Sequence, residues 1–131
     1  MTVEFRTIPV QTDKSILHDM KSILATIAKD KPTFKYAEPR ITLSRPSQKL
    51  PVEHPLVQQT AAIATDVYGY RPSIESMAIW CDTALLGAVG IPTIVIGQAG
   101  EGLHAKEEWV DIDSINETEQ IFVRLIDDWC Q

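Results

Sequence analysis

Cysteine is scarce in this sequence, with only Cys81 and Cys130 among 131 residues. The two residues stand far apart and neither has a second cysteine nearby. This spacing excludes a disulfide framework and a zinc ribbon, both of which need closely placed cysteines. We therefore expect both thiols to be reduced and to serve as packing residues.

Long apolar runs are also missing. The longest, residues 84–96, is interrupted by glycine and proline and is shorter than the ~20 apolar residues that a membrane-spanning helix needs. The first residues show no charged start followed by an apolar segment, so no signal peptide is visible. We expect no membrane association and a cytoplasmic protein.

Positively charged residues are also few. The sequence has 12 Lys and Arg against 18 Asp and Glu, which gives a net charge of -6. Without a basic stripe to meet phosphates, nucleic acid is excluded as an expected partner. What is present is a hydrophobic fraction of 44% with 23% charged residues. This balance is typical of a folded globular protein and not of a disordered chain.

The first third of the chain predicts a strand–helix–strand unit. Residues 3–9 alternate apolar and polar side chains, as a half-buried strand does, and end at a proline. Residues 12–29 carry apolar side chains at helical spacing, with Thr12 or Asp13 available as N-cap. A second extended stretch covers residues 34–43. Residues 44–55 hold three prolines and predict a linker, which favours a division into residues 1–48 and 49–131.

The remainder of the chain alternates helices and strands. The pattern first predicts a helix capped by His54 and running from Pro55 to Gly69, then a strand over 73–80 and a short helix over 83–89. A buried strand over 91–96 and an extended segment near 109–112 follow. The last helix is predicted to open at the capping-box sequence from Ser114 to Glu117. Such alternation indicates an α/β fold with a mainly parallel sheet covered by helices.

A candidate site follows the strand over residues 91–96. The glycine-rich residues 97–102 lead to His104, with Glu107 and Glu108 close behind. Loops at the carboxyl ends of strands are the usual place for ligands in α/β sheets, and imidazole is a common zinc ligand. Taken alone, however, a histidine such as His104 is more often a surface or hydrogen-bonding residue than a ligand, and the two glutamates fit a solvated pair.

Residues 90–110 (GIPTIVIGQAGEGLHAKEEWV) resemble a segment of the family of acetylornithine deacetylase, succinyl-diaminopimelate desuccinylase and carboxypeptidase G. In that family a strand, a Gly-Pro-Gly-like loop and a His-Ala-x-x-Glu motif close a dinuclear zinc site. The residues around Asp82, those around His54 and residues 3–9 resemble other segments of the same family, in the same order. The resemblance implies part of a lid or dimerisation domain over 1–48 and the C-terminal part of a catalytic domain over 49–131.

The resemblance also implies roles for particular residues and a cofactor, two zinc ions in the complete enzyme. It makes His104 a metal ligand and Arg45 a binder of the substrate carboxylate, and it places Asp82, Gly97, Gly100 and Glu108 beside the site. Two of these keep an alternative from the sequence itself. Asp82 also fits a helix N-cap, and Arg45 also fits a solvated linker residue.

The family's other zinc ligands and its general base have no counterpart here. The sequence contains no His-x-Asp pair and no Glu-Glu pair other than Glu107 and Glu108. We therefore expect the C-terminal portion of a zinc-dependent metallopeptidase or deacylase acting on an amide or peptide bond to an amino acid, inactive alone. Its expected partner is a missing N-terminal half or a second copy. The alternative is a non-catalytic oligomerisation or interaction module.

Overall fold

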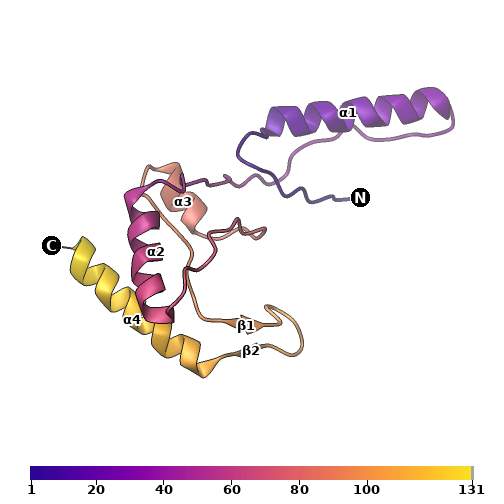
Figure 1. Ribbon diagram of the computed structural model, residues 1–131. Coiled ribbons are helices and arrows are strands. Elements are labelled where there is room, and N and C mark those ends of the chain that lie inside the picture. Colours follow the sequence, from indigo (N-terminus) through magenta and orange to yellow (C-terminus); the bar gives the residue numbers. More distant parts are fainter. Residues whose placement is uncertain (131) are drawn as a thin grey trace.

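The computed structural model describes residues 1–130 and is mostly helical. Its elements are α1 (Asp13–Asp30), α2 (Pro55–Tyr68), α3 (Thr83–Ala88), β1 (Gly100–Glu101), β2 (Trp109–Val110) and α4 (Ile112–Trp129). Figure 1 shows α2, α3 and α4 gathered together, whereas α1 lies on an arm that extends away from them. Within residues 1–130, no helix is both long and apolar enough to cross a membrane.

Helix α1 begins where the sequence predicts. The hydroxyl of Thr12 accepts a hydrogen bond from the backbone N–H of Ser15 at 3.2 Å, and the hydroxyl of Ser15 accepts one from the N–H of Thr12 at 3.0 Å. This reciprocal pair satisfies two amides that the first helical turn leaves free. No residue of α1 is buried, and apolar residues of its stripe, Ile16, Met20 and Leu24, are half-buried.

Helix α2 confirms both of its predicted ends. His54 Nδ1 accepts a hydrogen bond from the N–H of Leu56 at 3.1 Å, and Pro55 occupies the first turn, where a missing N–H costs nothing. Gly69 ends the helix with φ 75°, a left-handed conformation that glycine adopts without a steric penalty.

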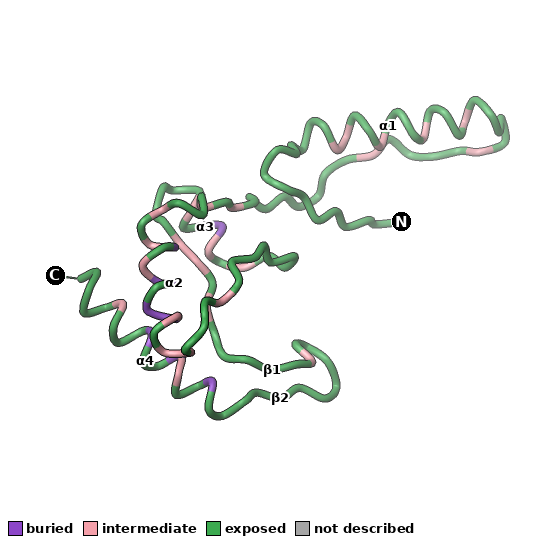
Figure 2. The backbone as a smooth tube through the Cα atoms, viewed as in Figure 1, coloured by how far each residue is buried: buried purple, intermediate pink, exposed green. Residues whose placement is uncertain are grey.

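The hydrophobic core lies where α2 meets α4. Ile63 and Ala64 of α2 pack with Ile121 of α4, which has no exposed surface. Partly buried side chains surround them, namely Val67, Tyr68, Ile96 and Leu125. Figure 2 shows buried residues along the facing sides of these two helices and a chain that is otherwise largely exposed.

Helix α4 begins two residues before the predicted capping box. Asp111 is the N-cap, and its carboxylate accepts hydrogen bonds from the N–H groups of Asp113 and Ser114. The prediction that Ser114 opens this helix was wrong because Asp111 is also a good capping residue and lies upstream. Ser114 instead lies inside the first turn and is buried.

The predicted parallel sheet is not formed within residues 1–130. The segments over 3–9, 34–43, 73–80 and 91–96 contain no paired strand, and the sheet that forms is the antiparallel pair β1–β2. An alternating or β-branched sequence favours an extended backbone, but a ladder also needs a neighbouring strand to take up its N–H and C=O groups. The described chain brings no such neighbour alongside these segments.

The cysteines are both free, as predicted. Cys81 is half-buried, but Cys130 is exposed, so its assignment as a packing residue was wrong. Cys130 directly follows Trp129, the last residue of α4. The division at residue 48 stays a prediction.

Candidate functional site

The predicted metal-ligand loop forms a small hairpin. Strands β1 and β2 pair Gly100 with Val110 and Glu101 with Trp109, and residues 102–108 connect them. His104 lies in the turn, is exposed, and has φ 63°, which makes it the sole non-glycine residue with positive φ among the described residues. A left-handed histidine is uncommon and marks a backbone held by its surroundings.

Two glycines make this turn possible. Gly102 has φ 78°, and a Cβ atom at this position would collide with the carbonyl oxygen of Glu107. A Cβ on Gly100 would collide with the carbonyl oxygen of Trp109. The two sides of the hairpin therefore approach so closely that only glycine fits at both positions.

Ser114 fastens the base of the hairpin to α4. Its hydroxyl accepts a hydrogen bond from the N–H of Ala99 at 2.9 Å and donates one to the carbonyl oxygen of Asp111 at 2.6 Å. The N–H of Asp111 in turn donates to the carbonyl oxygen of Ala99 at 2.9 Å. Sequence reasoning missed this role, although a serine three residues after a capping aspartate is positioned to bond back to the loop before the helix.

Four of the predicted site residues lie on this hairpin or on the segment that leads into it. Gly100 is in β1, His104 in the turn, and Glu108 directly before β2, while Gly97 lies in the lead-in with no atom within 4 Å of the place a Cβ would occupy. His104 and Glu108 are both exposed. The hairpin thus presents an imidazole and a carboxylate to the outside of the described chain.

Asp82 lies away from the hairpin, at the start of α3. Asp82 occupies the N-cap position of this helix, as the alternative expects, but its side chain makes no capping hydrogen bond. Asp82 lines a groove of about 500 Å³ whose walls are otherwise mainly apolar, formed by Cys81, Thr83, Leu86, Ile94, Val95, Ile96, Phe122 and Leu125. Ile96, one of the lining residues, directly precedes Gly97. Asp82 therefore shares this groove with the segment that leads into the hairpin and not with the turn.

Arg45 contacts an aromatic ring. Its guanidinium carbon lies 5.5 Å from the centre of the Trp80 ring, a distance suited to a cation–π contact. The indole N–H of Trp80 donates to the carbonyl oxygen of Pro46 at 3.2 Å. Arg45 is exposed, as the linker alternative expects, but it is held beside Trp80 rather than free in solvent.

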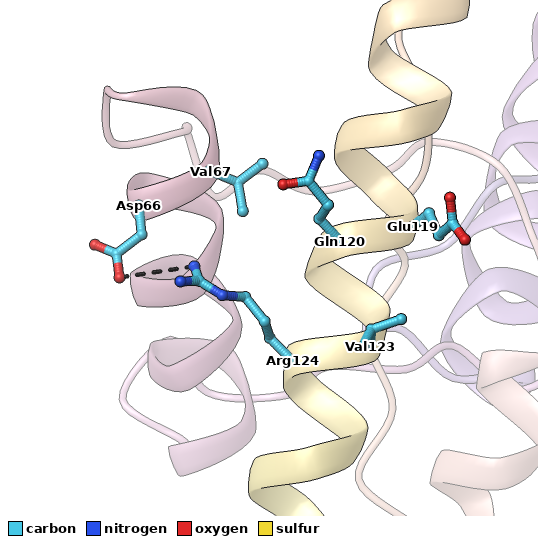
Figure 3. A pocket seen from close by; sticks show the side chains of 6 residues that line it. All are labelled: Asp66, Val67, Glu119, Gln120, Val123 and Arg124. Atoms are coloured by element: carbon cyan, nitrogen blue, oxygen red, sulfur yellow. Dashed lines mark ion pairs between the residues drawn. The ribbon is translucent and has the colours of Figure 1, made fainter.

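A second hollow lies between α2 and α4 (Figure 3) and is lined by Asp66, Val67, Glu119, Gln120, Val123 and Arg124. Asp66 and Arg124 form an ion pair across it at 3.8 Å, whereas Glu119 points away from them. Its lining includes no histidine, cysteine or hydroxyl group. This hollow therefore offers no imidazole, thiol or hydroxyl group for chemistry.

The resemblance implies two zinc ions. Among residues 1–130, no three His, Cys, Asp or Glu side chains gather in a way that could hold a metal ion. A zinc site needs three or four protein ligands, and a two-metal site needs more. The described residues do not fit a complete zinc centre by themselves, and His104 is at most one part of one.

The sequence matches the description of peptidase family M20/M25/M40 over residues 7–128. No curated protein and no solved structure matches it significantly. The family match includes the hairpin with His104, the α2–α4 core and helix α1, and it extends over nearly all of the 131 residues. The chain therefore belongs to peptidase family M20/M25/M40.

Proposed function

We propose that this chain is the C-terminal portion of a zinc-dependent metallopeptidase or deacylase, which hydrolyses an amide or peptide bond to an amino acid. His104 is one metal ligand, and the other ligands and the general base come from outside residues 1–130. The observation that carries the proposal is the hairpin, which holds an exposed imidazole on a constrained backbone within a chain of the M20/M25/M40 family.

The hairpin has the properties that a ligand loop needs. A metal ligand that is held in place before the ion arrives gives a higher affinity, because ordering it afterwards costs free energy. Gly100 and Gly102 allow the close approach of the two sides, and Ser114 fastens the base. Such a construction is more than a surface histidine requires and supports the role of His104 as a ligand.

The other predicted residues take supporting roles in this proposal. Gly97 and Gly100 shape the loop, Glu108 follows His104 in the motif, and Asp82 lies at the edge of the site. Arg45 binds the carboxylate of the substrate. A guanidinium that lies over a ring keeps its N–H donors at its edge, so the contact with Trp80 is compatible with this role.

The partner is either an N-terminal half of the catalytic domain or a second copy of this chain. The segments over 73–80 and 91–96 then pair with further strands in an α/β sheet. Their exposed apolar side chains support this, since Ile91 is 50% and Val95 53% exposed. Apolar surface of this kind next to unpaired backbone promotes association.

The test is hydrolysis of N-acyl amino acids with added zinc, by this chain alone and together with the polypeptide encoded immediately upstream of Met1. We expect no turnover by the chain alone and turnover by the combination. In the combination, His104→Ala should reduce kcat/KM by more than the ~100-fold that loss of a group behind a metal ligand typically causes. Lys106→Ala, in the same turn and also exposed, is the control and should change it little.

Robust turnover by the isolated chain would contradict the proposal, and so would full activity of the His104→Ala combination. If the two polypeptides associate but never hydrolyse any acyl amino acid, the chain is a non-catalytic interaction module instead.

A further inference from the structure

Residues 44–48 begin the predicted linker, but they do not behave as a free linker. Arg45 lies over the ring of Trp80, and the indole N–H of Trp80 donates to the carbonyl oxygen of Pro46. Trp80 lies directly before Cys81 and α3, so this contact joins the segment to the C-terminal part of the chain. Both members of the contact are exposed, and each interaction alone is weak.

Gln48 provides the most protected contact of this segment. Its side-chain amide donates to the carbonyl oxygen of Thr93 at 3.0 Å in a part-buried hydrogen bond. Its aliphatic portion lies against Gly87 of α3 so closely that a Cβ on Gly87 would be 2.6 Å from Gln48 Cγ. The glycine therefore leaves room for the glutamine, and Gln48 touches both α3 and the residues that lead to the hairpin.

The same segment is tied to the arm on its other side. Ser44 donates its hydroxyl to the Asp13 carboxylate at 2.9 Å, at the first turn of α1. A second tie joins the arm to the C-terminal part, because Arg6 donates to the carbonyl oxygen of Ala78 at 2.9 Å. Figure 1 shows that the arm otherwise extends freely, with α1 clear of α2, α3 and α4.

We propose that residues 44–48 form a strap that fixes the orientation of the arm, with Gln48 seated on Gly87 as its main fastening. Ser44 holds α1, Arg45 and Pro46 hold Trp80, and Gln48 holds Thr93 and α3. Contacts made by one short segment reinforce one another, because each contact that forms raises the effective concentration of the remaining groups near their partners. The strap does not depend on zinc or on catalysis.

The test measures the distance between α1 and α4 in the full chain by double electron–electron resonance. One spin label is placed at Lys29→Cys near the end of α1 and the other on the native Cys130, both exposed positions. Cys81→Ser removes the remaining thiol and keeps a hydroxyl near Thr83, whose Oγ1 lies 2.8 Å from Cys81 Sγ. The strap predicts one narrow distance distribution.

Gly87→Ala is the decisive variant. Alanine is a better helix former than glycine, so α3 should persist, but its methyl group occupies the place of Gln48 and should displace that side chain. We expect a broadened distribution with loss of the narrow peak, and the same for Gln48→Ala. Gly97→Ala adds a methyl group where nothing lies within 4 Å and should leave the narrow peak unchanged.

The strap is refuted if Gly87→Ala and Gln48→Ala both keep the narrow peak while circular dichroism shows unchanged helix content. It is also refuted if the distribution is already broad before either variant is introduced.

Discussion

Helices α1 and α4 have the same length of 18 residues, and each begins with a side-chain N-cap. They differ in what surrounds them. Helix α4 buries Ser114, Thr118 and Ile121, whereas α1 buries no residue. The comparison teaches that spacing of apolar side chains determines which face of a helix can be buried, while burial itself depends on a partner, here α2 for α4.

The two helices are consequently stabilised by different interactions. Most of the stability of a protein helix comes from tertiary packing of its apolar face, because nucleation of an isolated helix is costly. Helix α4 gains stability by removing apolar surface from water against α2. Helix α1 has its capping box and an exposed ion pair between Lys21 and Glu38 of the segment that follows the helix.

The largest effect should come from Ile121→Ala in α4. Ile121 has no exposed surface, and truncating a fully buried isoleucine lowers the free energy of unfolding by roughly 2 to 5 kcal/mol through lost burial and a cavity. Ile23→Ala in α1, where the side chain is 57% exposed, should change it by less than about 0.5 kcal/mol. Urea unfolding followed by circular dichroism measures both. If both variants lowered the free energy of unfolding equally, α1 and α4 would not differ in how much burial stabilises them.

Ser114→Ala should have the next largest effect. The change leaves the N–H of Ala99 without its acceptor in a part-buried position, and such an unsatisfied group costs about 1 to 3 kcal/mol. The Ala99 amide should also exchange with solvent faster, as measured by NMR. Ser22→Ala, an exposed serine of α1, is the matched control. If both variants unfold at the same urea concentration, Ser114 does not fasten the hairpin.

The smallest effect, and a local one, should come from Thr12→Ala. Loss of an N-cap costs about 1 kcal/mol, and here the loss falls on a helix that contacts no other helix. Backbone chemical shifts should report a less populated first turn of α1, while the unfolding transition of the α2–α4 pair stays where it was. Thr33→Ala, an exposed threonine outside the helices, should change neither. A shifted α2–α4 transition would show that the first turn of α1 contributes to the stability of the α2–α4 pair.

Helices were predicted well from the sequence because their signals are local. Thr12, His54 and Gly69 each act on backbone groups within a few residues, so the residue type and its neighbours suffice. The start of α4 was missed because Asp111 and Ser114 are both competent caps, and the choice between them depends on the hairpin that Ser114 also holds.

Strands were predicted less well because their pairing depends on distant partners, and the roles of the site residues stay predictions. Residues 91–96 have the composition of a buried strand, yet pairing needs a neighbour that no local pattern specifies. In the site, the glycines around His104 could be read from the sequence as a loop. The contact between Gln48 and Gly87 could not be predicted from the sequence, because the two residues are 39 positions apart.

The bond between Asp111 and Ala99 gives the hairpin a closed base, independent of what lies between those two residues. Loop closure depends only weakly on loop length, so insertions between Gly102 and Glu107 can be accommodated without moving α4. The tip of the hairpin can therefore change in length while the helical core that supports it stays the same.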